Sequence, residues 1–186
     1  MSTPALICDT GALLSYLDAR SPDHAAYRAA IDSARARYVP GLVLAELDYF
    51  LAGDRPAVRA FVSDLERRAF LYAPPTDSQL TRAMHVDQRY LRLRLGLVDG
   101  SIVALAEELG IVRLATRDVR HFSVVRLGNG RAFDLVVLPK SAARKRRLAS
   151  TPSAGHSTRH WPKQVSTSRP RWFWPRTPTP EPICAT

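Results

Sequence analysis

Short apolar runs alternate with helical patterns through the first three quarters of the chain. Positions 58, 61, 62 and 65 are apolar, which is the spacing of one face of a helix. The run 5–8 is continuously apolar, as expected for a short buried strand. We expect helices over 11–18, 24–37, 42–51, 58–65, 77–91 and 98–109, and strands over 5–8, 70–72, 111–115, 124–127 and 135–138. Strands that alternate with helices favour an α/β fold with a mostly parallel sheet.

Several element ends carry recognisable signals. Thr76 precedes a helical pattern and is a good N-cap residue. Gly110 follows the last apolar position of the helix 98–109, where glycine commonly ends a helix. Gly128-Asn129-Gly130 separates the two last expected strands as a turn. The helix 24–37 is rich in alanine, with Ala26, Ala30 and Ala34 on one face.

The positive charge of the chain is concentrated in its last quarter. Residues 1–139 hold 17 Arg, no Lys and 16 acidic residues, a net charge of +1. Residues 140–186 hold ten basic residues and one acid, Glu181, a net charge of +9. The latter stretch is rich in Pro, Ser and Arg and has no apolar period after Leu148, so we expect disorder there. The chain thus divides into a folded domain, 1–139, and a basic tail, 140–186.

The tail has two open interpretations. The segment 169–176 interleaves Arg with Trp and Phe, a composition suited to stacking on single-stranded nucleic acid. The simpler interpretation, which we favour, is an appendage without a selected role, even one produced by a displaced stop codon.

Other features of the sequence indicate the cellular compartment of the protein. No stretch of 18 apolar residues exists, so no membrane span is expected. The N-terminus lacks the basic region and cleavage site of a secretory signal. The only two cysteines, Cys8 and Cys184, rule out a disulfide scaffold, and Cys8 is expected in the core. These features favour a cytoplasmic protein.

Four acidic residues fall where chemistry is expected in such a sheet. Asp9 ends the first strand and Asp118 follows the strand 111–115, so the two emerge at one edge if these strands are parallel. Glu46 and Asp99 lie early in helices whose N-termini point to the same edge. Four carboxylates there would repel one another unless cations held them together, and hard oxygen ligands suit Mg²⁺ or Mn²⁺. Such ions commonly serve hydrolysis of phosphodiesters.

Each acid also has a simpler explanation. Asp9, Asp99 and Asp118 are good helix caps, and Glu46 is equally expected on a solvated helix face. Other chemistries are excluded more firmly. Gly11 stands where a haloacid-dehalogenase phosphatase needs a second Asp, and residues 1–139 lack the Lys of a response-regulator receiver. His156 and His160 have no zincin pattern, and His121 is expected to be a loop residue.

Four segments resemble the PIN-domain ribonucleases, specifically the VapC toxins of type II toxin–antitoxin pairs. They are ICDTGALL at 7–14, VLAELDY at 43–49, GLVDGSIVALA at 96–106 and LATRDVRHF at 114–122. Each is weak alone, but four in this order and spacing are specific. The chain departs from the family at Gly100, where many relatives have Ala or Ser, at Arg117 and Val119, and in the tail.

The resemblance implies a three-layer α/β/α fold and a Mg²⁺- or Mn²⁺-dependent endoribonuclease that inhibits translation. It implies that Asp9 and Asp99 are metal ligands and that Glu46 and Asp118 complete the catalytic pocket, in part through water. Thr10 and Thr116 are candidates to hold carboxylates or waters through their hydroxyl groups.

The resemblance also implies partners. A VapB-type antitoxin would cover the acidic pocket, with Arg or Lys in place of the metal's charge, and would carry the complex to DNA. The expected substrate is transfer RNA or ribosomal RNA. A homodimer is expected through the faces 42–51 and 58–65, and Tyr49-Phe50 is expected in the core or in that interface. The alternative is a non-catalytic nucleic-acid-binding protein that acts through its basic tail.

Overall fold

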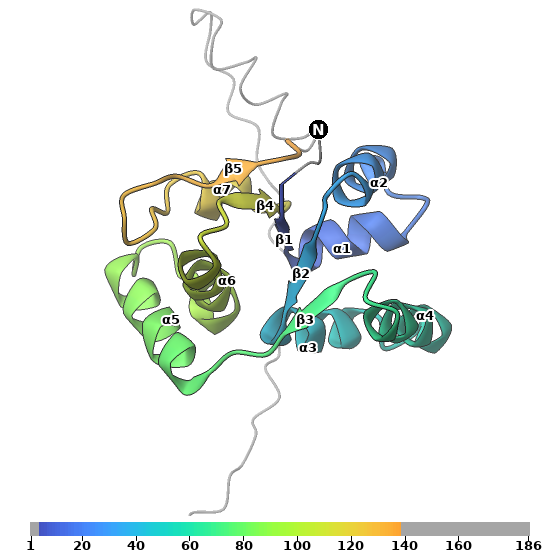
Figure 1. Cartoon of the computed structure of the whole chain (residues 1–186), viewed down its shortest axis with the longest axis horizontal. Helices are drawn as coiled ribbons and strands as arrows, with labels where there is room; N and C mark the ends of the chain where they lie inside the picture. Colours follow the sequence, from blue (N-terminus) through green and yellow to red (C-terminus); the bar gives the residue numbers. More distant parts are fainter. Residues whose placement is uncertain (1–3, 139–186) are drawn as a thin grey trace, which may run out of the picture. The chain divides into compact units, whose positions relative to one another are not determined.

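The computed structural model describes residues 4–138, which form a parallel sheet covered by helices (Figure 1). The sheet has five strands in the order β3-β2-β1-β4-β5, and every neighbouring pair is parallel. The strands are β1 (Leu6–Cys8), β2 (Arg37–Pro40), β3 (Leu71–Ala73), β4 (Arg113–Ala115) and β5 (Asp134–Leu135). The helices are α1 (Thr10–Leu17), α2 (His24–Asp32), α3 (Gly41–Phe50), α4 (Arg55–Glu66), α5 (Asp77–Arg89), α6 (Gly96–Leu109) and α7 (Val119–Phe122).

Helices cover both faces of the sheet, which confirms the predicted three-layer α/β/α fold. In Figure 1, α5 and α6 lie on one side of the strands and α1, α2 and α4 on the other. The central strand β1 is completely buried, as its continuous apolar run predicts for a strand that is covered on both faces. Cys8 lies in this strand and is a core residue, as expected.

Two predicted element ends are confirmed. Thr76 caps α5 through a capping box with Gln79, in which each side chain binds the other residue's backbone N–H. Gly110 ends α6 in the left-handed conformation, with φ of 66°. No helix within residues 4–138 is long and apolar enough to cross a membrane.

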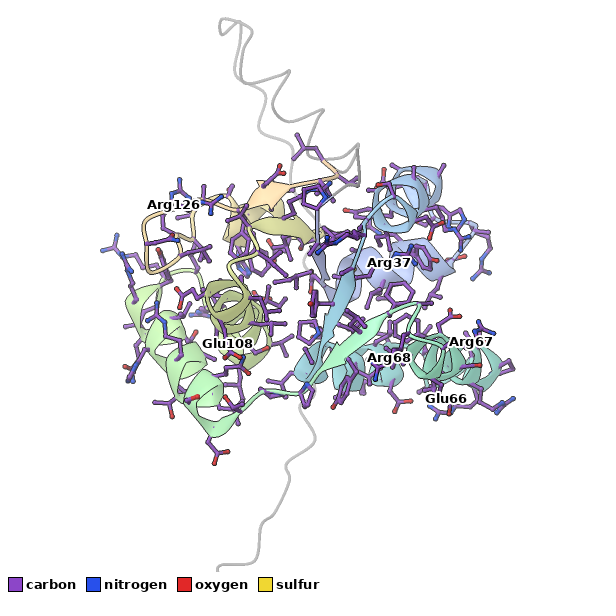
Figure 2. The ribbon with its side chains drawn as sticks, viewed as in Figure 1. Arg37, Glu66, Arg67, Arg68, Glu108 and Arg126 are labelled. Carbon is purple, nitrogen blue, oxygen red and sulfur yellow. The ribbon has the colours of Figure 1, made fainter. Side chains whose placement is uncertain are left out.

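The predicted helix 24–37 is wrong beyond Asp32. The helix α2 ends there and Arg37 begins β2, a strand that the prediction missed. The fully buried positions of α2 are Tyr27 and Ile31; of the three alanines, Ala26 is exposed, Ala30 is half-buried against the core, and Ala34 is buried after the helix has ended. Arg37 fixes this transition, because its guanidinium donates to the carbonyls of Asp32 and Ala69 (Figure 2).

The predicted strand 124–127 is also wrong, and α7 was not predicted. The guanidinium of Arg126, labelled in Figure 2, donates to the backbone carbonyls of residues 123, 124 and 125 at 2.8–3.0 Å. These carbonyls lie directly after α7, and the guanidinium takes the place of a neighbouring strand as their partner. The predicted strand 135–138 is reduced to β5, which pairs in parallel with β4 after the turn at Gly130, where φ is 81°.

Several expectations concern residues that the structure does not describe. They are the tail 140–186, the pair His156 and His160, the aromatic and basic segment 169–176, and Cys184.

The helices α5 and α6 approach each other closely at Gly100. A Cβ atom added there would lie 2.6 Å from the carbonyl oxygen of Ala83. We expect Gly100→Ala to lower the free energy of unfolding by about 2 kcal/mol, because so short a contact with backbone atoms should cost about 3 kcal/mol, the upper end of the usual overpacking range, against a gain of roughly 1 kcal/mol in helix propensity. Urea unfolding measures the change. Gly53→Ala is the matched control, since no atom lies within 4 Å of its added Cβ. Equal stability of the two variants would contradict the close packing.

Candidate active site

The parallel pairing of β1 with β4 sets the position of the first carboxylate. Cys8 pairs with Ala115, so Asp9 and Thr116 leave the sheet side by side at its carboxyl edge. The backbone N–H of Asp9 donates to the carbonyl of Ala115 at 2.9 Å. The predicted common edge for Asp9 and Asp118 is therefore present. Asp9 is only 7% exposed, so its charge lies out of contact with most of the solvent.

Two threonine hydroxyl groups orient carboxylates at this edge. Thr116 Oγ1 donates to Asp9 Oδ2 at 2.7 Å, and Thr10 Oγ1 donates to Glu46 Oε2 at 2.6 Å. Thr116 Oγ1 also accepts from the backbone N–H of Asp118 at 2.9 Å, which links that loop to Asp9. Both threonines thus contact carboxylates as the resemblance implies.

The simpler explanations of the acids hold for two of them. Asp9 is the N-cap of α1 and accepts from the backbone N–H of Thr10, and Asp118 is the N-cap of α7. Asp99 is not a cap, because α6 begins at Gly96 and places it within the first turn. Glu46 is half-buried in the middle of α3 and bonded to Thr10, so the solvated helix face is wrong for this residue.

His121 joins the remaining two acids. Its Nδ1 lies 2.8 Å from Asp99 Oδ2 and 3.0 Å from Asp118 Oδ2. Its backbone N–H donates to Asp118 Oδ1 at 3.0 Å. The three side chains form a group whose ligand atoms lie within 4.8 Å of one another. The expectation that His121 is a loop residue is wrong, because His121 lies in α7 and is only 8% exposed. The only sequence feature that linked His121 to the site was its position three residues after Asp118.

Burial raises the pKa of two of these carboxyls. The pKa of Asp9 rises from 3.8 to about 6, chiefly through burial, and the charges of Glu46 and Asp118 add to the rise. Hydrogen bonds from Thr116 and Thr10 oppose it. The pKa of Asp99 rises from 3.8 to about 6, again chiefly through burial, while the hydrogen bond from His121 opposes the rise. The ionised site is therefore electrostatically unfavourable in the protein alone.

The donor set fits a divalent cation. Within residues 4–138, no Lys or Arg forms an ion pair with Asp9, Glu46, Asp99 or Asp118. Carboxylates that converge without such a partner need another positive charge, and their hard oxygen atoms suit Mg²⁺ or Mn²⁺. Cys8, next to Asp9, is no alternative reactive group, because burial raises the pKa of its thiol to about 12.

A hollow of about 500 Å³ lies beside the second half of α1, the helix that begins directly after Asp9. Leu14, Leu17, Phe50 and Leu51 supply much of its apolar lining. Arg117 connects it to the acids, since this residue precedes Asp118 and its Nη1 donates to Ser15 Oγ at 3.2 Å. A hollow with both apolar and charged lining therefore begins within two turns of α1 from Asp9.

Comparisons with known proteins identify the family of this chain. The family model of the PIN domain matches residues 6–127. Ribonuclease VapC26 of Mycobacterium tuberculosis is 38% identical over 130 residues, which cover 68% of this chain and 96% of that protein. The crystal structure of the M. tuberculosis toxin VapC20, described as cleaving the sarcin–ricin loop, matches with a TM-score of 0.55 at 20% identity over 61% of this chain and 90% of its own. The chain belongs to the VapC-type PIN-domain family.

Proposed function

We propose that this protein is the toxin component of a type II toxin–antitoxin pair. It is a metal-dependent endoribonuclease that hydrolyses RNA phosphodiester bonds and thereby inhibits translation. The observation that carries the proposal is the convergence of Asp9, Glu46, Asp99 and Asp118 in a chain of the VapC-type PIN-domain family, without a Lys or Arg partner in residues 4–138. The relative VapC26 is named a ribonuclease, which supports the same activity here.

Asp9 and Asp99 are the proposed metal ligands, and Glu46 and Asp118 complete the catalytic pocket, in part through water. A divalent cation, Mg²⁺ or Mn²⁺, would supply Lewis acidity and positive charge to the scissile phosphate. The hydroxyl groups of Thr116 and Thr10 keep the carboxylates of Asp9 and Glu46 in fixed directions before RNA arrives.

Asp118 is suited to orient the attacking water. Its side chain is 41% exposed, more than that of the other acid bound to His121, so a carboxylate oxygen remains open to solvent. Its backbone N–H is held by Thr116 and its carboxylate by His121, which restricts its direction. A fixed carboxylate at the solvent side of the pocket can accept a hydrogen bond from water.

A VapB-type antitoxin is the proposed partner. A basic side chain of the antitoxin would enter the acidic pocket, where the carboxylates lack a Lys or Arg partner among the described residues. The apolar side chains of the same segment would fill the neighbouring hollow lined by Leu14, Leu17 and Phe50. The complex would bind DNA through the antitoxin, not through this chain.

We also propose a homodimer. Tyr49, on α3, is 76% exposed, and Val62, on α4, is exposed as well. The alternative that places Tyr49-Phe50 in the core is wrong, since both side chains are exposed. Exposed aromatic and aliphatic groups on adjacent helices are typical of contact surfaces between proteins.

The proposed substrate is transfer RNA or ribosomal RNA. The structural relative VapC20 is described as cleaving the sarcin–ricin loop, which is an example from the ribosomal class. The alternative function, nucleic-acid binding through the basic tail without catalysis, is not favoured, because it assigns no role to the four convergent carboxylates.

Asp9→Asn and Asp99→Asn should each abolish RNA cleavage and growth arrest while the protein still folds. The reason is that each acid serves the cation and not the core. Without metal, the melting temperature should stay equal or rise, because each substitution removes a charge that burial disfavours. Cleavage of total RNA and circular dichroism measure the two effects.

Glu66→Gln is the control, since this acid lies exposed on α4 (Figure 2). Growth arrest by the Asp99→Asn variant would refute the site.

Stabilisation by Mg²⁺ should depend steeply on pH. Asp9 and Asp99, whose pKa values lie at about 6, hold protons more tightly in the folded protein than in the unfolded chain. They therefore stabilise the metal-free fold below about pH 4, and this contribution is lost as the pH rises toward 6. The cation must displace these protons.

We expect Mg²⁺ at a hundredfold excess over its dissociation constant to raise the free energy of unfolding by about 2.7 kcal/mol at pH 7.5. At pH 5 each of the two carboxyls is roughly one tenth ionised, so most of this increase should disappear. Melting temperatures in MgCl₂ and in EDTA at both pH values provide the test, with Asp9→Asn as the variant in which the shift is reduced. An undiminished shift at pH 5 would mean that the cation binds elsewhere.

A chain that ends at Pro139 should keep its metal dependence and its cleavage position, because every matched motif precedes that residue. Its RNA affinity should depend less on salt. Each phosphate of single-stranded RNA that a basic side chain neutralises adds about 0.7 to the steepness of log affinity against log salt, and the tail has ten basic residues. Filter binding at several salt concentrations measures the slope. An unchanged slope would mean that the tail does not bind RNA, and loss of folding would place the domain boundary elsewhere.

A further inference from the structure

His121 occupies the centre of the contact between two loops of the site, yet the proposed hydrolysis gives it no role. It is buried, and its ring lies between the carboxylates of Asp99, on α6, and Asp118, before α7. No other side chain within residues 4–138 bridges these two acids. Two carboxylates that approach the same point repel each other, so a donor between them determines how close they can stay.

The neighbouring arginine defines which ring nitrogen carries the proton. Arg120 Nη2 lies 2.9 Å from His121 Nε2. A guanidinium can only donate hydrogen bonds, so Nε2 must be the acceptor and Nδ1 must carry the proton. Nδ1–H therefore donates to Asp99 Oδ2 at 2.8 Å, and the same nitrogen lies 3.0 Å from Asp118 Oδ2 as an ion-pair contact. A protonated Nδ1 has no lone pair in the ring plane for a metal.

The same contacts leave one oxygen of Asp99 open. Asp118 Oδ1 accepts from the backbone N–H of His121, and the Oδ2 of this 41% exposed side chain lies 3.0 Å from the ring Nδ1. Asp99 is held at Oδ2 only, and no donor among residues 4–138 reaches its Oδ1. Asp99 Oδ1 is therefore free to bind a cation. Asp118 can contact a cation or a water molecule only through the oxygen lone pairs that face away from His121.

We propose that His121 is a positioning residue of the metal centre, which holds Asp99 and Asp118 together through Nδ1–H and leaves Asp99 Oδ1 for the divalent cation. The proposal rests on the proposed function, in which a cation binds at these acids. Arg120 acts one step further out, because it keeps the proton on Nδ1. Side chains that orient metal-binding carboxylates in this way typically change metal affinity or activity by about 10- to 100-fold when they are removed.

The test compares Mn²⁺ binding by the full chain without RNA, in the wild type and two variants. In His121→Asn, the amide nitrogen can stand near the place of Nδ1 and donate to the carboxylates, so the dissociation constant should stay within about threefold. In His121→Leu, the volume is similar but the donor is absent, so the constant should rise by about 10- to 100-fold. His85→Leu, an exposed position on α5, is the control and should bind as the wild type. Equal binding by His121→Leu and the wild type would overturn the proposal.

Two spectra separate positioning from direct ligation. The electron spin echo spectrum of Mn²⁺ bound to the wild type should lack the ¹⁴N coupling of a bound imidazole, and ¹⁵N NMR should show His121 protonated at Nδ1. Imidazole coupling, or a proton on Nε2, would refute the assignment and make His121 a ligand or a spectator. These spectra also decide the question if His121→Leu does not fold. Absence of Mn²⁺ binding by the wild type would instead refute the proposed function itself.

Discussion

The parallel register of β1 and β4 is the constraint on which the site depends. It places Asp9 directly after a fully buried strand, beside Thr116, which directly follows the neighbouring strand β4. A carboxylate at this position loses most of its hydration, and this loss is the largest cause of the rise in its pKa. The same edge receives Glu46 from α3 and Asp118 from the loop after β4, which add negative charge. The core that stabilises the fold therefore also concentrates charge that the fold does not neutralise.

Several arginines of residues 4–138 bind groups outside the site. Arg82 forms a two-pronged ion pair with Glu107 at 2.7 and 2.8 Å, and Glu107 also accepts from the backbone of Gly128. This pair connects α5, α6 and the turn before β5, and it lowers the pKa of Glu107. Other arginines bind backbone carbonyls, as Arg37 and Arg126 do. The nearly balanced charge of residues 1–139 thus conceals a separation. Several acids outside the site pair with Arg, whereas no Lys or Arg among residues 4–138 pairs with the four site acids.

Much of this arrangement could be predicted from the sequence, since the signals are local. A buried strand followed by Asp9, a second strand followed by Thr116 and Asp118, and the glycine after α6 each act within a few residues. The elements that the sequence did not predict correctly depend on contacts between residues that lie far apart in the chain. The strand β2 is too short for a periodic pattern, and its start is fixed by Arg37 contacts to Asp32 and Ala69. His121 became visible only when α6 and α7 brought Asp99 to its ring.

The groups that hold the carboxylates have one property in common: they donate hydrogen bonds without supplying a Lys or Arg charge. Thr10 and Thr116 orient the carboxylates of Glu46 and Asp9, and His121 joins Asp99 to Asp118. Such donors fix geometry but leave net negative charge in a poorly hydrated place, so the binding of any positive group there is favoured. A divalent cation and a basic side chain of a protein partner would satisfy the same requirement and would exclude each other. In the proposed toxin, activation and inhibition would therefore follow from a single electrostatic feature, the uncompensated charge at the edge of β1 and β4.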